Sequence, residues 1–374
     1  MKKLFIVTGE YSGDIHAAKV VRELKKLNCD LEIEGIGGIA LEKEGVKLFT
    51  NQEKMSAMGI SPQIIINHFK LGKSLVNYLI NDYKPDLVLL IDYGAFNLSI
   101  AKFLHKAGIK IFYYIPPQVW ASRKYRINLI KKYVDKVLCI FPFEKPLYAQ
   151  FGIDTHYCGH PLVSQLPPPA GRREFLRKHG FDVDRPFISV FPGSREFELK
   201  NLMPVFKAAA EKLQHRHPDL QFCFSQAPNI PDEVYNKYYQ DADFKVIKGE
   251  NQAMLSVSDA LILASGTVAL EACLYKTPMI IAYKGPQILY WIYLLVRCIK
   301  MVSLPNIIAN KIIVPELIQK KATAVNITAE IESLLYDSER REQNIKDLGT
   351  VKTLLSDKNS AFEVAKVIDM ELFP

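Results

Sequence analysis

Acidic, hydroxyl and imidazole side chains crowd one glycine-containing turn near the start of the chain. The turn runs Thr8-Gly9-Glu10-Tyr11-Ser12-Gly13-Asp14-Ile15-His16 and follows the apolar run Leu4–Val7. Its glycines allow a ligand to approach the backbone, and either Ser12 or Asp14 suits a helix cap. A simple strand-to-helix turn needs the glycines and one cap, but not Glu10, Asp14 and His16 together. We therefore interpret this turn as part of a functional site.

Two turns in the second half of the chain have the composition of a nucleotide site. Pro192-Gly193-Ser194-Arg195 follows the apolar run Phe187–Phe191, and an arginine beside backbone N–H groups suits a diphosphate. Ala264-Ser265-Gly266-Thr267 leads into Glu271, one helical turn after Thr267. Hydroxyl and N–H groups bind phosphate, and a carboxylate accepts both hydroxyls of a ribose. Together the turns predict a site for a nucleoside diphosphate.

Three other patterns are weaker guides to chemistry. Gly35-Ile36-Gly37-Gly38-Ile39-Ala40 matches the dinucleotide fingerprint, but the fingerprint belongs after the first strand of its unit. This motif alone supports the alternative of a nicotinamide dehydrogenase. Asp182-Val183-Asp184 and Asp241-Ala242-Asp243 have the form of metal–diphosphate triplets, yet both precede predicted strands. That is the wrong end for ligand binding, so we interpret both triplets as surface turns.

The elements that position these turns are short apolar runs that alternate with amphipathic stretches. The runs are β-branched and nearly continuous, which is typical of parallel strands covered on both faces. They occur at Leu4–Val7, Leu31–Ile36, Leu87–Ile91, Ile109–Ile115, Val137–Phe141, Phe187–Phe191, Leu220–Ser225, Phe244–Ile247, Ala260–Ala264 and Met279–Tyr283. Between the two sets of five lies Pro167-Pro168-Pro169-Ala170-Gly171, the clearest linker signal in the chain.

This organisation predicts an α/β protein with two Rossmann-like domains facing a cleft. We expect an N-terminal domain at residues 1–166 and a C-terminal domain at residues 172–335. Residues 336–374 are expected to be a helical segment, which packs on the N-terminal domain or on a partner subunit.

Composition limits the class of protein. The 374 residues are 49% hydrophobic and 24% charged, which is ordinary for a globular chain. The six cysteines are scattered without a CxxC pair, so we expect free thiols in a reducing compartment and neither disulfides nor zinc. No apolar stretch reaches the roughly 20 residues of a membrane span, and the N-terminal apolar run is too short for a signal peptide. We therefore expect a cytosolic protein.

The positive charge is concentrated in one window. The formal net charge is +8, and residues 102–136 hold nine Lys or Arg and one acid. This window is either a solvated helical face or a surface that meets anions such as phosphate or acidic lipid. No nucleic-acid-binding module is recognisable, so we discount nucleic acid as a partner.

Ten segments of the chain are similar to the lipid-A-disaccharide synthase family, inverting glycosyltransferases of the two-domain B type. They are Gly9-Glu10-Tyr11-Ser12-Gly13-Asp14, Met55-Ser56-Ala57-Met58-Gly59, Ile91-Asp92 with Phe96-Asn97, Pro117-Gln118-Val119-Trp120-Ala121, Phe141-Pro142-Phe143-Glu144, Gly159-His160-Pro161-Leu162, Pro192-Gly193-Ser194-Arg195, Ala264-Ser265-Gly266-Thr267 with Leu270-Glu271, Ser303-Leu304-Pro305-Asn306 and Val314-Pro315-Glu316-Leu317. The chain departs from the family at Gly94 and Ala95, where many relatives carry a proline and often a second Asp.

The resemblance implies a reaction and its partners. It is the transfer of 2,3-diacylglucosamine from UDP-2,3-diacylglucosamine to 2,3-diacylglucosamine 1-phosphate (lipid X) with inversion, which gives the β-1,6-linked disaccharide 1-phosphate and UDP. The N-terminal domain would bind the acceptor and the C-terminal domain the UDP-sugar. No cofactor and no metal is expected. The oligomeric state stays open, with a homodimer as one option.

The resemblance also implies roles for particular residues. Asp92, directly after the strand Leu87–Ile91, is the expected general base, with Asp14, His16 and Glu10 as rivals. Arg195 is expected at the diphosphate and Glu271 at the ribose. The catalytic set is Asp92, Arg195 and Asp14, and the substrate-binding set is Glu10, Ser12, Gly13, His16, Gln118, Gly193, Ser194, Ser265, Gly266, Thr267, Glu271 and Asn306.

Lipid substrates imply reversible attachment to the cytoplasmic face of the inner membrane. Ile60–Ile80 and Ile288–Val296 both combine apolar and aromatic side chains with nearby cations, as interfacial helices do. We prefer the first stretch, since it shares the acceptor-side domain with the basic window, although either could be a buried helix. A UDP-sugar epimerase of the same fold and a non-catalytic membrane adaptor remain alternative functions.

Overall fold

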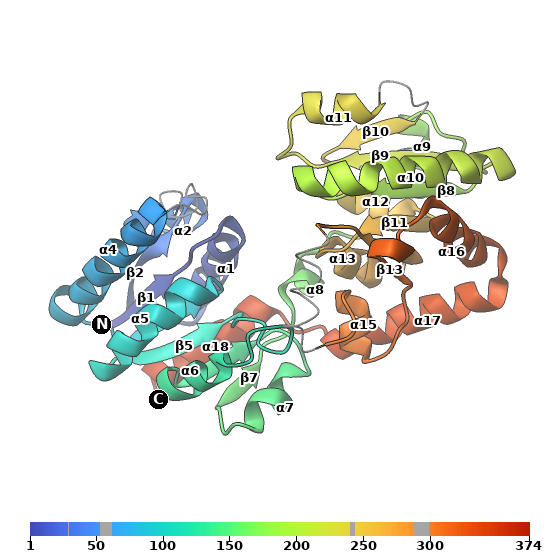
Figure 1. Ribbon diagram of the computed structural model, residues 1–374. Coiled ribbons are helices and arrows are strands. Elements are labelled where there is room, and N and C mark those ends of the chain that lie inside the picture. The colour runs from blue at the N-terminus through green and yellow to red at the C-terminus, as the bar shows by residue number, and fades with distance from the viewer. Residues whose placement is uncertain (29, 53–61, 240–243, 287–298) are drawn as a thin grey trace. The chain divides into compact units, whose positions relative to one another are not determined.

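The computed structural model describes residues 1–28, 30–52, 62–239, 244–286 and 299–374. The chain divides into two compact units: unit 1 is residues 1–164 with 355–374, and unit 2 is residues 165–354. Each unit is a parallel β-sheet with helices packed against it (Figure 1). The predicted α/β class with two Rossmann-like units is confirmed.

Unit 1 is built on a seven-stranded sheet in which all neighbouring strands are parallel. Across the sheet the strands are β3 (Lys47–Asn51), β2 (Leu31–Gly37), β1 (Lys2–Val7), β4 (Leu87–Ile91), β5 (Lys110–Tyr114), β6 (Lys136–Cys139) and β7 (Thr155–Tyr157). The strand order changes direction between β1 and β4, so the loops after these neighbours diverge. Open α/β sheets bind ligands at the carboxyl ends of the strands flanking such a point.

The described helices of unit 1 cover this sheet. They are α1 (Tyr11–Leu27), α2 (Ile39–Lys43), α4 (Pro62–Tyr78), α5 (Gly94–Lys106), α6 (Arg126–Tyr133), α7 (Glu144–Ala149), α8 (Pro161–Gln165) at the unit boundary and α18 (Ser360–Leu372). Helix α1 buries Ala17, Val21 and Leu24, which recur at helical spacing. All five residues of β4 are buried, which explains why its sequence is a continuous apolar run.

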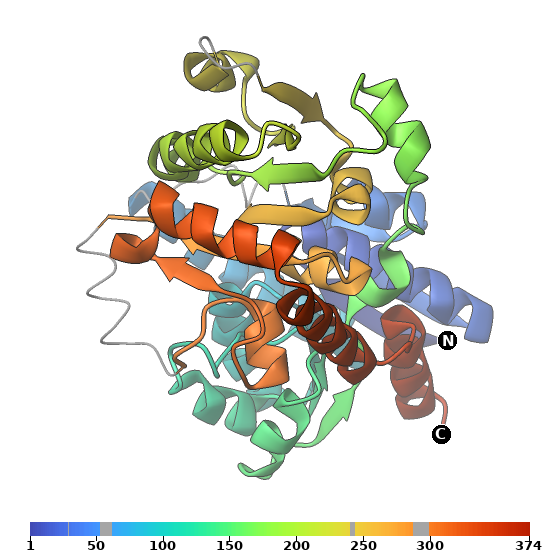
Figure 2. The same cartoon turned by 90° about the vertical axis from the view of Figure 1, so that its right-hand side faces the viewer.

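Unit 2 repeats the plan with a six-stranded parallel sheet. Its strands in spatial order are β10 (Lys245–Lys248), β9 (Gln221–Gln226), β8 (Phe187–Phe191), β11 (Ala260–Ala264), β12 (Met279–Tyr283) and β13 (Glu316–Ile318). Its helices are α9 (Arg172–Lys178), α10 (Glu196–Arg216), α11 (Asp232–Tyr239), α12 (Asn251–Val257), α13 (Val268–Tyr275), α15 (Leu304–Ala309), α16 (Ala324–Tyr336) and α17 (Ser338–Leu355). Helices α10 and α16 pack together over β11 and β12 (Figure 2). The strand order changes direction between β8 and β11, whose loops carry the two nucleotide-like turns.

The C-terminal segment 336–374 is divided between the units. Helix α17 packs within unit 2 almost to its end, and the chain then returns to unit 1, where α18 lies along α1. Among the described cysteines, Cys139, Cys158, Cys223 and Cys273 are buried free thiols. None of the described helices is long and apolar enough to cross a membrane.

Candidate functional site

Asp92 lies directly after β4, in a backbone turn that the surrounding structure must hold. Asp92 and Tyr93 both have left-handed backbone angles, with φ of 48° and 46°. Such angles cost non-glycine residues on the order of 1–3 kcal/mol each and cluster at functional sites. The Asp92 carbonyl accepts hydrogen bonds from Asn97 Nδ2 at 2.8 Å and from the Tyr113 hydroxyl at 2.7 Å. These two donors fix the turn and therefore the direction in which the Asp92 carboxylate points.

The surroundings of the Asp92 carboxyl favour its protonated form. Burial raises its pKa above the ordinary value, and the negative charge of Glu10 raises it further. The backbone N–H of Tyr93 opposes the rise. A carboxylate with a raised pKa is a stronger base, as general-base catalysis requires. Glu10 itself is exposed at the start of α1.

Asp14 has a different partner set from the one expected of a base. It is buried, and its carboxylate accepts the N–H groups of Gly38 at 2.8 Å, Ala40 at 2.9 Å and Leu41 at 3.2 Å. It therefore caps helix α2. A Cβ at Gly38 would lie 2.9 Å from Asp14 Oδ2, so this approach requires glycine. The dinucleotide-like motif thus surrounds a carboxylate of the chain itself, which explains its glycines without a cofactor.

The other residues of the first turn divide between surface and interior. Ser12 is exposed, and Gly13 is buried in the first turn of α1. His16 is largely enclosed, and its Nδ1 has no hydrogen-bond partner. Burial and then the charge of Lys19 lower its pKa to about 4, so the ring is neutral at pH 7. A base must also face its substrate, and the exposed members of this turn are Glu10, Tyr11 and Ser12, of which Glu10 is the acid.

The two family segments after β5 and β6 form one cluster. Gln118 is exposed in the turn after β5. Two residues later, Trp120 Nε1 donates to the buried Glu144 at 3.0 Å, and the N–H of Phe141 donates to the same carboxylate at 3.1 Å. Burial raises the pKa of Glu144 to about 7 against the effect of these donors. The Trp120 ring meets that of Phe143 edge to face at 5.2 Å. Sequence analysis found both segments but did not predict that Glu144 orients Trp120.

An apolar groove of about 700 Å³ lies between α4 and α5. Its lining is mainly aliphatic and aromatic: His68, Phe69, Gly72, Lys73, Val76, Tyr93, Ala95, Phe96, Ser99, Ile100 and Phe103. Phe69 and Phe103 are 73% and 52% exposed, which is unusual for large aromatic side chains. Tyr93, the neighbour of Asp92, belongs to this lining and bonds His68 Nε2 through its hydroxyl at 2.5 Å. The groove therefore begins beside the turn that holds Asp92.

In unit 2 the two nucleotide-like turns meet in one polar pocket of about 400 Å³. The pocket contains every nucleotide-binding residue expected in this unit except Asn306: Gly193, Ser194, Arg195, Ser265, Gly266, Thr267 and Glu271. Ser225, Asn251 and Gln252 also line it and were missed in the sequence. Ser225 lies near the carboxyl end of β9, and Asn251 and Gln252 are the first residues of α12, which follows β10. Their position at the carboxyl ends of neighbouring strands is the signal that could have found them.

Two acidic residues in this pocket differ in how far their carboxylate oxygens are already used as hydrogen-bond acceptors. Glu198 is buried, and its Oε2 accepts the N–H of Ser194 at 2.9 Å and that of Arg195 at 3.3 Å. The backbone donors expected for a diphosphate are thus already used, while the Arg195 side chain is 71% exposed. Glu271 receives only a long bond from Gln252, at 3.3 Å, and burial raises its pKa. Arg195 and Glu271 are therefore the groups best placed to meet a ligand.

Asn306 has a structural task and does not line the pocket. Its Oδ1 accepts the N–H groups of Ile313 at 2.8 Å and Val314 at 2.9 Å. Its Nδ2 donates to the Val314 carbonyl at 2.9 Å and to Glu316 at 2.8 Å. Both amide hydrogens and both oxygen lone pairs are thus used within the chain. The expected contact of Asn306 with UDP finds no support in this geometry.

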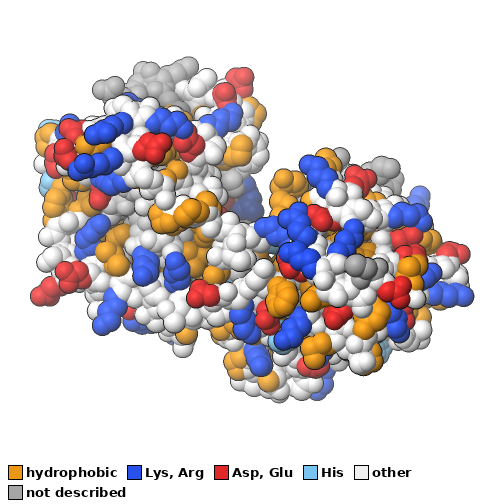
Figure 3. All heavy atoms as spheres, turned by 180° about the vertical axis from the view of Figure 1, so that it is seen from behind, with side chains coloured by type: hydrophobic (Ala, Val, Ile, Leu, Met, Phe, Trp, Pro, Cys, Tyr) orange, Lys and Arg blue, Asp and Glu red, His pale blue; other side chains and the backbone are white. Residues whose placement is uncertain are grey.

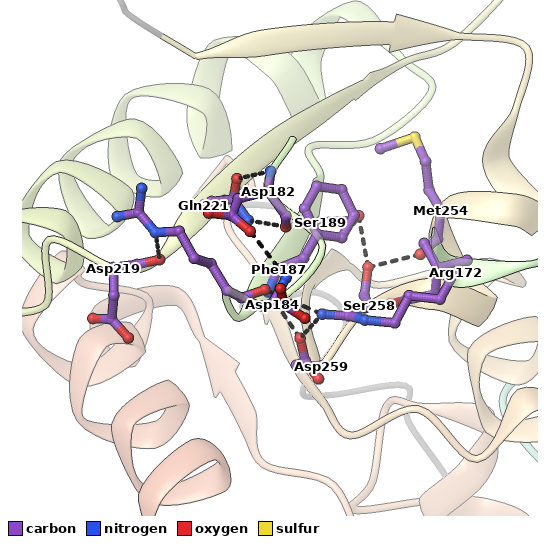
Figure 4. Close-up of polar contacts among 12 residues, drawn as sticks. Arg172, Asp182, Asp184, Phe187, Ser189, Asp219, Gln221, Met254, Ser258 and Asp259 are labelled. Atoms are coloured by element: carbon purple, nitrogen blue, oxygen red, sulfur yellow. Dashed lines mark hydrogen bonds and ion pairs between the residues drawn. The ribbon is translucent and has the colours of Figure 1, made fainter. Parts of the chain in front are cut away.

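The first Asp-x-Asp triplet is a turn at the amino end of β8 (Figure 4). The N–H of Asp184 donates to Asp182 Oδ1 at 3.0 Å, and the Asp182 backbone exchanges hydrogen bonds with the Gln221 amide. The polar pocket lies at the carboxyl end of the same strand. Residues 241–243 lie outside the described part of the chain. Within that part, no cluster of three His, Cys, Asp or Glu side chains could hold a metal ion.

A sequence model of the lipid-A-disaccharide synthetase family matches residues 4–368. The chain belongs to this family. Lipid-A-disaccharide synthase of Coxiella burnetii (strain CbuK_Q154) is 34% identical, over 100% of this chain and 99% of that protein. The enzyme of the same name from Myxococcus xanthus (strain DK1622) is 34% identical, over 100% of this chain and 98% of that protein.

Solved structures with a similar fold support the fold expected for this family. A putative UDP-N-acetylglucosamine 2-epimerase from Listeria monocytogenes has a TM-score of 0.67 at 15% identity, covering 99% of this chain and 96% of that one. A glycosyltransferase from Rickettsia africae ESF-5 has a TM-score of 0.56 at 15% identity, covering 99% and 97%. The two-domain B-type fold is confirmed. As a lipid-A-disaccharide synthase family member, the chain is a glycosyltransferase of lipid A biosynthesis.

Proposed function

We propose that the chain transfers 2,3-diacylglucosamine from UDP-2,3-diacylglucosamine to 2,3-diacylglucosamine 1-phosphate with inversion. The observation that carries this proposal is the unit 2 pocket, which gathers two turns with hydroxyl groups, the exposed Arg195 and the half-buried Glu271 in about 400 Å³. These are the groups that a uridine diphosphate requires: a cation for phosphate and a carboxylate for ribose hydroxyls.

The reaction needs one base and a stabilised leaving group. The acceptor 6-hydroxyl oxygen attacks the anomeric carbon of the donor, and the bond from that carbon to the UDP oxygen breaks. Asp92 takes the hydroxyl proton, while Arg195 and the Ser265-Gly266-Thr267 turn stabilise the charge that develops on UDP. The hydroxyl attacks the face of the anomeric carbon opposite to UDP. This direct displacement inverts the anomeric centre and needs no covalent intermediate.

Asp92 is the preferred base because the rival residues are otherwise engaged. The Asp14 carboxylate is bound by three backbone N–H groups, and the His16 ring is largely buried. Glu10 is exposed and raises the pKa of Asp92 through its charge. We assign it, with Ser12 and Gln118, to the acceptor-binding surface of unit 1.

The apolar groove between α4 and α5 supports lipid substrates. It is wide enough for acyl chains and begins at Tyr93, next to the proposed base. We propose that its exposed rim, Phe69 and Phe103 with Lys70 and Lys73, attaches the enzyme to the cytoplasmic face of the inner membrane. Residues 60 and 61 of the first candidate stretch, and all of Ile288–Val296, lie outside the described residues.

The attachment is tested with vesicles that contain anionic phospholipid. Because each buried aromatic ring contributes about 2 kcal/mol, the double variant Phe69→Ser, Phe103→Ser should lower the vesicle-bound fraction at least tenfold. Tyr336→Ser, an aromatic on unit 2 that is as exposed as Phe103, is the control and should change nothing. Unchanged binding of the double variant would move the attachment surface elsewhere.

The overall reaction is tested by UDP release. The purified chain is incubated with both lipid sugars, with each alone, and with EDTA. We expect release only when both lipids are present, and no loss of rate with EDTA. Release from the donor alone would contradict the transfer, and epimerisation of UDP-N-acetylglucosamine would favour the activity named for the Listeria protein. Activity restored by magnesium would reopen the Asp-x-Asp triplets.

A further inference from the structure

In the basic window 102–136, Arg126 differs from the other cations in its combination of exposure and ion pairing. Lys110 pairs with Glu371, and Lys136 with Asp154 at 2.6 Å. Arg126, the first residue of α6, is only half-exposed, yet among the described residues no carboxylate forms an ion pair with it. A guanidinium that gives up part of its hydration normally gains an anion in return. On the face shown in Figure 3, Lys and Arg side chains are interspersed with Asp, Glu and hydrophobic side chains.

Arg126 lies beside the turn that carries the proposed base. A Cβ at Gly94 would be 3.2 Å from Arg126 Nη1, so the guanidinium lies next to the space that a side chain would fill two residues after Asp92. The same Cβ would be 2.6 Å from Pro117 Cγ, which leaves no space for a side chain. The missing side chain is what allows Arg126 to approach.

The electrostatics of Tyr113 support this placement. The Tyr113 hydroxyl donates to the Asp92 carbonyl at 2.7 Å. Its pKa is raised by burial and by the charge of Asp92, and the positive charge of Arg126 counters that rise. Arg126 and Asp92 thus both act on the same buried hydroxyl, with opposite charges. The guanidinium of Arg126 is therefore near the turn that carries Asp92.

We propose that Arg126 binds the phosphate of the acceptor. This inference rests on the proposed function, in which the acceptor is a sugar 1-phosphate. In that molecule C1, which carries the phosphate, and C5, which carries the CH2OH group, are both bonded to the ring oxygen, so the phosphate and the reacting 6-hydroxyl flank the same edge of the sugar. With the hydroxyl at Asp92, the phosphate meets the guanidinium, which contacts phosphate oxygens in a bidentate manner. Arg126 then selects phosphorylated acceptors and orients the hydroxyl toward its base.

The test compares two acceptors, 2,3-diacylglucosamine 1-phosphate and 2,3-diacylglucosamine without the phosphate. For the wild-type chain, removing the phosphate should lower kcat/KM for the acceptor about 10- to 100-fold, the effect of one charge-assisted pair. Arg126→Ala should lose a similar factor with the phosphorylated acceptor and almost nothing with the other. Arg126→Lys should restore part of the preference, and the donor KM should not change.

Lys132→Ala is the matched control. Lys132 is exposed in the last turn of the same helix and should keep the full preference for phosphate. If Arg126→Ala or Arg126→Lys discriminates between the acceptors as strongly as the wild type, the assignment is wrong. If the wild-type chain releases no UDP with either acceptor, the proposed function fails instead, so the two failures are distinct.

Discussion

The two units place a carboxylate after a parallel strand, but they surround it in opposite ways. In unit 1, Asp92 sits on a left-handed turn whose carbonyl is held by Asn97 and Tyr113. In unit 2, Glu271 lies in the first turn of α13, in a pocket lined by many polar groups. The turn in unit 1 fixes the position of one reactive carboxylate and strains the backbone. The pocket in unit 2 brings several binding groups together without such strain. We infer from this difference that unit 1 supplies the base and unit 2 binds UDP.

Both units also contain acidic residues that lie in the predicted functional motifs but whose contacts stabilise the fold. Asp14 and Glu144 in unit 1, and Glu198 in unit 2, have their oxygens filled by N–H groups of their own unit. A carboxylate with two or three such donors stabilises a turn and cannot also accept a substrate proton. The acids with few donors, Asp92 and Glu271, are therefore the ones to test.

The largest effect is expected from Asp92→Asn. An amide cannot accept the hydroxyl proton, so kcat should fall about 100- to 10,000-fold, the usual contribution of a general base. The unfolding temperature should not fall, because the change removes a charge whose burial opposes ionisation. Steady-state kinetics with both lipids measure the first and thermal unfolding the second. A variant that keeps most of its kcat would give the reactive role to Glu10.

Arg195→Ala should have the next largest effect. Without the guanidinium, transition-state stabilisation should fall by about 2–4 kcal/mol, the range for one well-placed donor of charge. Its partner Glu198 is mostly occupied by backbone N–H groups, so the fold should remain intact. Lys200→Ala, an exposed cation on the same helix, is the control. Equal turnover of both variants would remove Arg195 from the mechanism.

Asp14→Asn should affect stability rather than chemistry. The amide can replace at most one oxygen of the carboxylate and turns its own N–H groups toward backbone donors. The free energy of unfolding should fall by about 1–3 kcal/mol, while kcat per folded molecule stays near the wild-type value. Denaturant titration compares this variant with Asp82→Asn, an exposed acid of the same unit. Loss of kcat without loss of stability would restore Asp14 as a catalytic residue.

The smallest expected effect is a dependence of the free energy of unfolding on pH. Burial lowers the pKa of His16 to about 4 from an ordinary 6.5, so between these pH values the unfolded chain binds a proton that the folded chain does not. This contribution to stability is complete above pH 6.5 and is lost as the pH falls, by about 1 kcal/mol between pH 6.5 and 5.5. His16→Gln should reduce the slope of stability against pH in that range. The exposed His105→Gln is the control, and an equal change in both variants would contradict the burial of His16.

The sequence predicted the fold better than it predicted the site. The strands Phe187–Phe191, Ala260–Ala264 and Met279–Tyr283 are observed with the predicted bounds, because continuous buried β-branched runs have few alternatives. The roles of Asp14 and Asn306 could not be predicted in the same way. Their partners are backbone N–H groups, which have no sequence signature and come into reach only when the fold brings distant turns together.

The assignment of the base to unit 1 and of UDP binding to unit 2 is tested most directly by measuring the affinity for UDP. Calorimetry should compare the wild-type chain with Asp92→Asn and Glu271→Gln, alongside turnover measured on the same preparations. We expect Asp92→Asn to bind UDP as the wild type does while losing turnover, and Glu271→Gln to bind UDP about tenfold more weakly through loss of charge-assisted bonds to the ribose. Unchanged UDP affinity in Glu271→Gln, or weakened affinity in Asp92→Asn, would contradict the assignment of UDP binding to unit 2 and of the base to unit 1.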